Sequence, residues 1–166
     1  MENWYVLYVK SRSEKSVAQQ LRKIGLGALA PTQVQWRQWS DRKKKVEVVL
    51  FPNYVFVSSE AQRKSKVFRA SNVLNFVQFG GRIATLTEEE VDMVKALGQI
   101  ENPVQIDYQR FTKGEEVEIQ SGSLAGYRGQ VLAVNGRKRI RLALPSLYCF
   151  AEVELYNVRI SRLKVA

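Results

Sequence analysis

The chain has 166 residues, 45% of them hydrophobic and 25% charged, a composition typical of one medium or two small globular domains rather than a disordered protein. It contains no histidine and a single cysteine, Cys149, which excludes Ser-His and Cys-His nucleophile pairs, His or thiolate zinc sites and an internal disulfide. The net charge of +10 favours an anionic partner, with nucleic acid as the first candidate; the alternative is a solvated basic surface.

Nothing in the sequence indicates a membrane or export segment. No apolar stretch approaches the roughly 20 residues that a membrane span needs. The N-terminus "MENWYVLYVK" lacks the basic start, apolar core and cleavage site of a signal peptide. Together with the cysteine count, these features predict a cytoplasmic protein.

Residues 3–10 and 11–26 are predicted to form a strand followed by an amphipathic helix. "NWYVLYVK" is rich in aromatic and β-branched residues, as strands are. In the next segment Ser13 is a candidate N-cap, and Gly25 and Gly27 end the helix. The apolar positions recur at intervals of four and three on one helix face: Val17, Leu21 and Ile24.

The middle of the chain is predicted to be largely extended. Residues 32–39 and 43–51 form two strands around the polar tip "SDRKK". Residues 60–71 form a short helix, and residues 74–81 a strand that two glycines stop.

A further strand follows a turn at Pro52. Because side chains alternate along a strand, Tyr54 and Phe56 point to the same face. Val55 and Val57 are expected to point the other way, into the core. The two rings belong either to the core or to a sticky surface for a partner.

The C-terminal part is predicted to be a small all-β domain. "TEEEVDMVKALG" is a helix capped by Thr87, and residues 101–111 have no sustained period and form a linker. Short strands with turn signals follow, including a hairpin at Asn135-Gly136. Their number and spacing predict a small β-barrel, so the fold class is α+β.

Several segments stand in a recognisable order and spacing: "WYVLYVKSRSEK", "ALAP", "LFPNYVFV", "VLNFVQFGG", "TLTEEEV" and "VEIQSGSLAGYRGQV". They resemble the NusG family of transcription elongation factors, the last one its KOW motif. The resemblance implies an N-terminal α/β sandwich domain (antiparallel sheet with helices) at residues 1–100, a linker at 101–111 and a small KOW β-barrel at 112–166. Within the family, the first three segments look most like the specialised RfaH and UpxY-type antiterminators, and Asn53 stands where general NusG proteins more often carry Gly.

The resemblance implies an apolar patch that binds the clamp helices of the largest RNA polymerase subunit. Carried over by position, the patch consists of Tyr54, Phe56, Phe79, Leu86 and Phe76. The alternative places some of these side chains in the domain's own core, and for Phe76 the two assignments are equally balanced. Truncation of aromatic anchors in such a patch costs about 2 kcal/mol or more in binding.

The resemblance also implies contact with the non-template DNA strand through the first helix. The residues concerned are Lys10, Arg12, Lys15, Arg22 and Lys23, whereas Gln20 departs from the family's pattern. A second basic group, at the hairpin tip, would bind phosphates without selecting sequence: Arg42, Lys43, Lys44 and Lys45. The alternatives are a solvated helix face and a solubilising loop.

In the C-terminal domain, Gly122, Gly126 and Gly129 of the KOW motif permit tight turns and close backbone approach. By resemblance, this domain recruits a small-subunit ribosomal protein or the termination factor Rho. The clean alternation of "RKRIRLALP" favours strands over a refolding into helices. A monomer without cofactor, metal or membrane contact is expected.

These observations predict a transcription elongation and antitermination factor that acts by binding and not by catalysis. One alternative is a KOW-containing RNA-binding ribosomal or translation-associated protein, since the charge also suits RNA. Another is a metal-dependent nuclease that uses the carboxylates of Glu88, Glu89 and Asp92.

Overall fold

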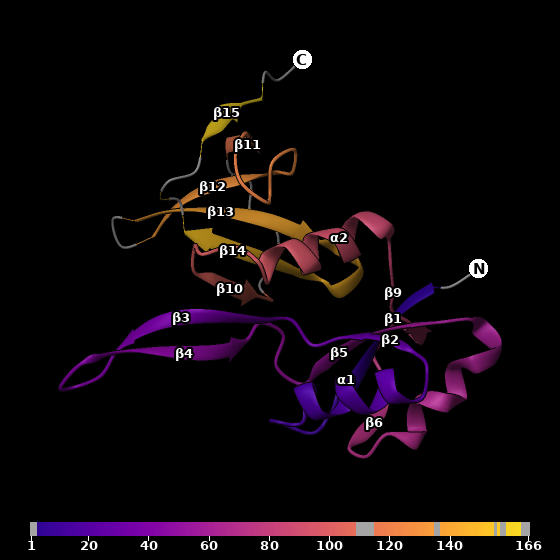
Figure 1. Cartoon of the computed structure of the whole chain (residues 1–166). Coiled ribbons are helices and arrows are strands. Elements are labelled where there is room, and N and C mark those ends of the chain that lie inside the picture. The colour runs from indigo at the N-terminus through magenta and orange to yellow at the C-terminus, as the bar shows by residue number, and fades with distance from the viewer. Residues whose placement is uncertain (1–2, 109–114, 135–136, 155, 157–158, 164–166) are drawn as a thin grey trace. The chain divides into compact units, whose positions relative to one another are not determined.

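The structure is a computed structural model that describes residues 3–108, 115–134, 137–154, 156 and 159–163 (Figure 1). The chain divides into two compact units. The first unit is Met1–Pro31 with Phe51–Val91, and the second is Thr32–Leu50 with Asp92–Ala166. Each unit is described by itself.

The first unit contains an antiparallel sheet in which β1 pairs with β5, β6 and β9, and β5 also pairs with β2. Its strands are β1 (Asn3–Val9), β2 (Gly27–Leu29), β5 (Tyr54–Ser59), β6 (Val73–Phe76) and β9 (Thr85–Leu86). The 3-10 helix η1 (Ala61–Arg69) connects β5 to β6.

Helix α1 (Glu14–Lys23) buries Val17 and Leu21 of the predicted apolar stripe, whereas Ile24, its third member, follows the helix and is exposed. Its buried side chains share one core cluster with Tyr5, Leu7 and Val9 of β1 and with Val55 and Val57 of β5. The expectation that these two valines point into the core is therefore confirmed. Beyond the helix, Gly25 has a φ of +87°, a left-handed conformation that only glycine adopts at no cost.

The segment predicted as one strand over residues 74–81 is divided in the structure. β6 ends at Phe76, and the backbone N–H of Val77 then donates to the carbonyl of Val6. The short strands β7 (Gln78–Phe79) and β8 (Arg82–Ile83) form a hairpin beyond it. The two glycines between them have φ values of +58° and +77°, so they form the turn of this hairpin.

Helix α2 (Glu88–Leu97) begins with a reciprocal capping arrangement. The N–H of Glu90 donates to the hydroxyl of Thr87, and the N–H of Thr87 donates to the carboxylate of Glu90. Thr87 is therefore the cap that the sequence predicts, and Glu90 completes a capping box.

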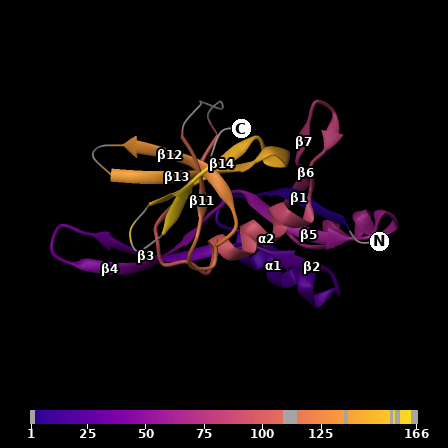
Figure 2. The ribbon, with the colours of Figure 1, turned by 90° about the horizontal axis from the view of Figure 1, so that it is seen from above.

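The second unit combines a long hairpin with an antiparallel sheet. The hairpin consists of β3 (Thr32–Gln38) and β4 (Lys43–Val49), and its turn end projects beyond the other strands of this unit (Figure 2). The sheet has the order β10-β14-β13-β12-β11-β15. Its strands are β10 (Val104–Asp107), β11 (Glu115–Ile119), β12 (Arg128–Val134), β13 (Arg137–Leu144), β14 (Cys149–Glu154) and β15 (Ile160–Arg162), with the 3-10 helix η2 (Pro145–Leu147) before β14.

Two sequence predictions concern this sheet: the linker and the turn at Asn135-Gly136. Strand β10 lies inside the segment predicted as the linker, 101–111, and pairs with β14 through four residues. The predicted turn at Asn135-Gly136 lies outside the described residues, although the pairing of β12 with β13 on either side of it is antiparallel.

The hairpin is fixed to the segment before β10 by one buried side chain. Gln33, which is 2% exposed, donates to the carbonyls of Ile100 and Asn102 at 2.8 and 2.7 Å. Its side-chain oxygen accepts from the N–H of Val104 at 3.0 Å. These bonds give both N–H groups and the oxygen of this buried amide a partner, as burial of an amide requires.

Candidate binding surfaces

The first unit carries a shallow hollow with aromatic walls, which we call the aromatic hollow. Tyr8 of β1 and Tyr54 of β5 lie opposite each other in the sheet register. Their ring centroids are 6.5 Å apart at an interplanar angle of 71°, and Tyr8 is 41% exposed. The hollow is lined by Tyr8, Tyr54, Asn75, Phe76, Val77, Gln78 and Phe79.

The structure brings together three of the five residues predicted to form an apolar patch. Tyr54, Phe76 and Phe79 are half-buried and line the hollow. Phe56 is on the same face of β5 as Tyr54, as predicted, but it is only 1% exposed. Leu86 is likewise buried, so the expectation that these two side chains project to a partner is wrong for this structure.

The reason for the burial of Phe56 is local packing. Its ring lies edge-on against Phe51, with centroids 5.1 Å apart at 84°. Such edge-to-face pairs are favourable beyond the area that they bury. Alternation along a strand predicts which face a ring is on, but not whether another residue covers that face.

Phe76 combines the two roles that the sequence leaves open. Its ring lies edge-on to the rings of Tyr5 and Phe68, with centroids 5.8 and 5.9 Å apart, and it packs on the core cluster. It also lines the aromatic hollow. Tyr8, which the patch prediction omits, is the more exposed wall, and the sequence held no signal for it, because Val6 on the same face of the strand is buried.

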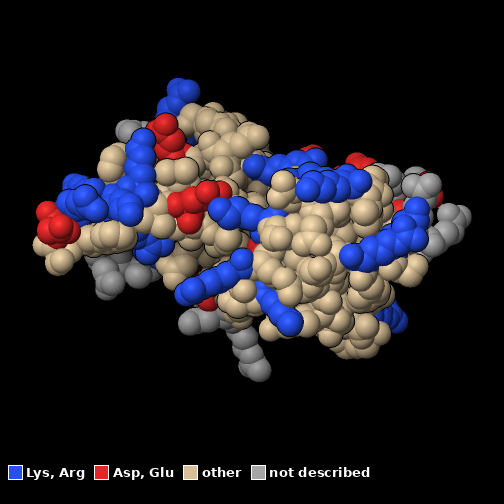
Figure 3. Space-filling view, turned by 60° about the horizontal axis from the view of Figure 1, so that its bottom comes forward, with Lys and Arg blue, Asp and Glu red and all other residues tan. Residues whose placement is uncertain are grey.

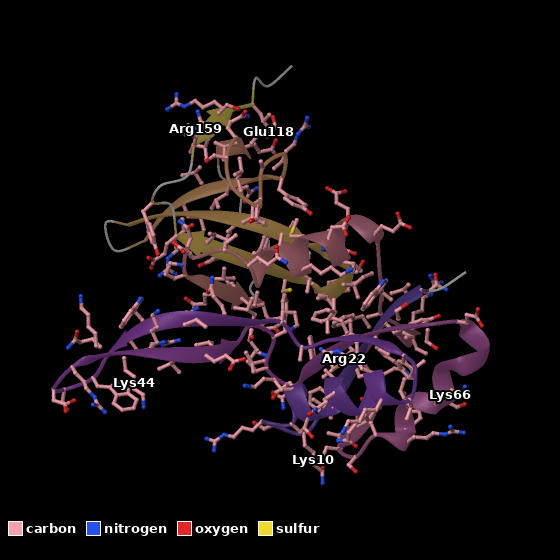
Figure 4. The ribbon with its side chains drawn as sticks, viewed as in Figure 1. Lys10, Arg22, Lys44, Lys66, Glu118 and Arg159 are labelled. Atoms are coloured by element: carbon pink, nitrogen blue, oxygen red, sulfur yellow. The ribbon has the colours of Figure 1, made fainter. Side chains whose placement is uncertain are left out.

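The basic residues predicted at α1 are all exposed. Lys10 and Arg12 lie in the turn before the helix, and Lys15, Arg22 and Lys23 on the helix itself. Figure 4 labels Lys10 and Arg22 beside α1. Lys15 and Arg22 are seven residues apart and therefore share one side of the helix.

Two polar contacts hold this basic face in place. The Nε of Arg22 donates to the carbonyl of Ala28 in β2 at 3.0 Å. Gln20, where the family's pattern is not followed, accepts the N–H of Ser71 at 2.9 Å. Gln20 therefore connects α1 to the loop before β6.

The second basic group lies at the outer end of the hairpin. Arg42, Lys43, Lys44 and Lys45 are exposed, and Figure 3 shows basic side chains gathered there. The ammonium of Lys44 lies 4.5 Å from the centroid of the Trp39 ring, and that of Lys45 lies 5.1 Å from the Trp36 ring. The predicted basic tip thus includes two tryptophans that the sequence interpretation treated as ordinary strand residues.

The glycines of the predicted KOW motif have the two uses expected of them. Gly122 and Gly126 have φ values of +80° and +92°, so both occupy turn conformations that other residues rarely adopt. A Cβ on Gly129 would overlap the carbonyl oxygen of Arg141 and contact Ile140 and Leu142. Gly129 therefore allows β12 to approach β13 closely.

The model of one protein family, described as transcription termination factor nusG, matches residues 2–95. The match covers more than half of the chain. The chain belongs to the NusG family. The family predicted from the sequence is thereby confirmed, and the matched residues include the aromatic hollow, the basic face of α1 and the hairpin.

Relatives in the NusG family extend over most of the chain. The transcription termination/antitermination protein NusG of Xylella fastidiosa is 28% identical over 171 residues, covering 87% of this chain and 90% of the relative. The protein of the same name from Pasteurella multocida is 28% identical over 178 residues, covering 94% and 96%. A solved structure described as "Domain interaction in Thermotoga maritima NusG" is 21% identical, covers 94% of both chains and has a TM-score of 0.54, which supports the fold.

The described residues also bear on metal binding and on membrane insertion. Over the residues that the structure describes, no group of three or more His, Cys, Asp or Glu side chains is placed to hold a metal ion. Within the same residues, no helix has the length and apolar character needed to cross a membrane.

Proposed function

We propose that this chain is a transcription termination/antitermination factor, the activity that the names of its NusG relatives state for them. It acts by binding RNA polymerase, and thereby suppresses pausing and termination. The observation that carries the proposal is the aromatic hollow between Tyr8, Tyr54 and Phe79. A depression with exposed aromatic walls and a partly polar lining, on an otherwise basic protein, is typical of a protein–protein contact.

The occupant of the hollow is the pair of clamp helices of the largest polymerase subunit. An amphipathic helix buries its apolar side in a groove through a few anchor side chains. Tyr8 and Tyr54 form the walls of such a groove with large apolar rings, and their phenol hydroxyls can form hydrogen bonds at its rim. Phe56 and Leu86 are buried, so in this proposal they contribute to folding and not to the contact.

The basic face of α1 contacts the non-template DNA strand. Lys10, Arg12, Lys15 and Lys23 place exposed positive charge along α1 and the turn before it. Arg22 is positioned by its bond to Ala28, and its terminal N–H groups can bind a phosphate in addition. These contacts give affinity and orientation rather than sequence selection.

The C-terminal strands form a KOW domain that recruits a second partner. In this proposal residues 1–100 bind polymerase, residues 101–111 connect and also add strand β10 to the C-terminal sheet, and residues 112–166 form a small barrel that binds a small-subunit ribosomal protein or Rho. The turn conformations of Gly122 and Gly126 and the close approach at Gly129 support it. Asn53 and its neighbours favour a specialised antiterminator of the RfaH or UpxY type.

The test is retention of purified RNA polymerase by the full chain and by Tyr8→Ala and Tyr54→Ala. Loss of either ring is expected to weaken binding by roughly tenfold or more. Phe56→Ala is a poor probe because a buried ring also contributes to folding. Ile24→Ala is the matched control, since Ile24 is an exposed apolar residue of the same unit and does not line the hollow.

Undiminished retention by both tyrosine variants would exclude the hollow as the polymerase site. Retention of ribosomes in place of polymerase by the wild-type chain would favour the alternative, a KOW-containing RNA-binding protein of the translation machinery. Retention of polymerase that falls equally with Ile24→Ala would mean that the effect is not specific to the hollow.

A further inference from the structure

The outer half of the β3–β4 hairpin exposes large aromatic surface. Trp36 is 66% exposed and Trp39 is 45% exposed. A strand pair ordinarily buries its largest apolar side chains, and exposed indoles that gather in one place mark a binding surface. Neither ring belongs to the core cluster described for the first unit.

The two rings lie on opposite faces of the hairpin. Trp36 is paired with Lys45 in the register, and Arg37 is paired with Lys44. Since neighbouring side chains alternate, Lys45 and Lys44 point to opposite faces. Each carries its ammonium to a different indole, Lys45 to Trp36 and Lys44 to Trp39.

The surroundings of the rings are strongly basic. The hairpin carries Arg37, Arg42, Lys43, Lys44 and Lys45 against Asp41 and Glu47. A hollow beside Trp36 is lined by Trp36, Arg37, Gln38 and Lys43. An occupant must therefore be anionic and must also present flat apolar faces.

Unpaired nucleotides have both properties. Aromatic side chains beside cations are the arrangement by which proteins bind single strands without reading sequence. A duplex keeps its bases stacked within a stiff helix, so it cannot place bases on two rings that face opposite ways. A single strand can pass around the turn of the hairpin and use both.

We propose that the hairpin end binds single-stranded nucleic acid by stacking bases on Trp36 and Trp39 while its lysines and arginines neutralise the phosphates. The rings and cations contact features that DNA and RNA share, so the site does not discriminate between their sugars. The sequence and the family resemblance assign only the basic residues here. The proposal does not depend on polymerase binding and is tested without it.

The test uses the full chain, titrated with an oligothymidylate of about 12 nucleotides, within the site sizes of single-strand binders, and with an oligouridylate of equal length. Tryptophan fluorescence reports stacking directly. Trp4, the remaining tryptophan of the three in the chain, is half-buried in the first unit and provides a constant background. Both oligonucleotides are expected to quench the fluorescence and to bind with affinities within about threefold of each other.

Variants separate stacking from charge. The double variant Trp36→Ala with Trp39→Ala is expected to show no fluorescence quenching and to lose roughly tenfold in affinity for each ring removed. The double variant Trp36→Phe with Trp39→Phe keeps aromatic rings at both positions and is expected to recover most of the affinity. Lys44→Gln with Lys45→Gln keeps the rings and lowers the slope of log affinity against log salt by roughly one. Val34→Ala is the matched control, because Val34 is 58% exposed and two residues before Trp36 on the same strand face.

Several results would overturn the proposal. They are unchanged affinity in the double alanine variant, an equal loss with Val34→Ala, and ring-dependent binding of the matched duplex as tight as that of the single strand. Absence of binding to either oligonucleotide, or a preference beyond tenfold for one sugar, would also overturn it. In the first case the exposed rings are left to a protein partner.

Discussion

The carboxylate of Glu14 accepts a hydrogen bond of 2.9 Å from the backbone N–H of Asn53, although 39 positions separate the two residues in the sequence. Glu14 is 3% exposed at the start of α1, and Asn53 forms the turn before β5. The side chain of Asn53 donates to the carbonyl of Val9, whose N–H donates to the carbonyl of Asn53. One turn thus connects the end of β1, the start of α1 and the strand that carries Tyr54.

The backbone of Asn53 explains the choice of residue. Its φ is +68°, a conformation that glycine and asparagine adopt at a lower cost than most other residues. Asn53→Ala is expected to lower the free energy of unfolding by about 2 kcal/mol, from backbone strain and the lost side-chain bond. Asn53→Gly keeps the backbone and is expected to cost about 1 kcal/mol. Denaturant unfolding of the two variants measures this; equal losses would show that the conformation is not the cause.

Phe56 and Tyr54 are expected to separate folding from binding. Phe56→Ala removes a ring that is 1% exposed and packs on Phe51, so it is expected to lower the free energy of unfolding by about 3–5 kcal/mol. Tyr54→Ala truncates a half-buried ring, with an expected loss of about 1 kcal/mol. Thermal or denaturant unfolding compares them directly. A Phe56→Ala protein as stable as Tyr54→Ala would mean that the ring is not part of the packed interior.

Local sequence patterns predicted much of this fold but missed one strand of the second unit's sheet. The burial of Val17 and Leu21 in α1, the cap at Thr87 and the alternation that turns Val55 inward are set by neighbours in sequence, and all are confirmed, whereas Ile24 of the same stripe is exposed. Strand β10 was missed because four residues after a proline have no visible period, and its pairing partner β14 is distant in the chain.

The candidate site follows the same division. Positive charge at α1 and at the hairpin was predictable, because long charged side chains are exposed in almost any fold. The burial of Phe56, the exposure of Tyr8 and the positions of Trp36 and Trp39 were not, because each depends on tertiary contacts between strands. The sequence therefore predicted that the protein has an aromatic surface and basic surfaces better than it predicted which residues form them.

Gly129 is expected to tolerate no side chain. A Cβ added at Gly129 would overlap the carbonyl oxygen of Arg141, and β12 and β13 would have to move apart to make room for it. Gly129→Ala is therefore expected to lower the free energy of unfolding by about 3 kcal/mol or more. Gly122→Ala is the control: nothing lies near its Cβ, and only its φ of +80° opposes a side chain, for about 1–2 kcal/mol. Unfolding monitored by circular dichroism ranks the two; a smaller loss at Gly129 would contradict the close approach of these strands.

Arg141 is expected to be the most sensitive charged residue of the second unit's sheet. Its side chain is 8% exposed and donates to the carboxylates of Asp107 on β10 and Glu152 on β14, the latter at 3.0 Å. Its guanidinium also lies 4.9 Å from the ring of Phe150. Arg141→Met leaves two largely buried carboxylates without this partner, so a loss of about 3–5 kcal/mol in the free energy of unfolding is expected.

Arg139 provides the matched comparison on the same strand. Its side chain is 22% exposed, and its guanidinium lies 3.4 Å from the carboxylates of both Glu152 and Glu154. Because these ion pairs are longer and more exposed to solvent than those of Arg141, Arg139→Met is expected to lower the free energy of unfolding by about 1 kcal/mol. The two variants remove the same charge from β13, so a general effect of net charge would lower both equally. A difference of severalfold between them, seen in denaturant midpoints at unchanged slope, would show that the buried pairing of Arg141 with Asp107 and Glu152 holds β10 to the sheet.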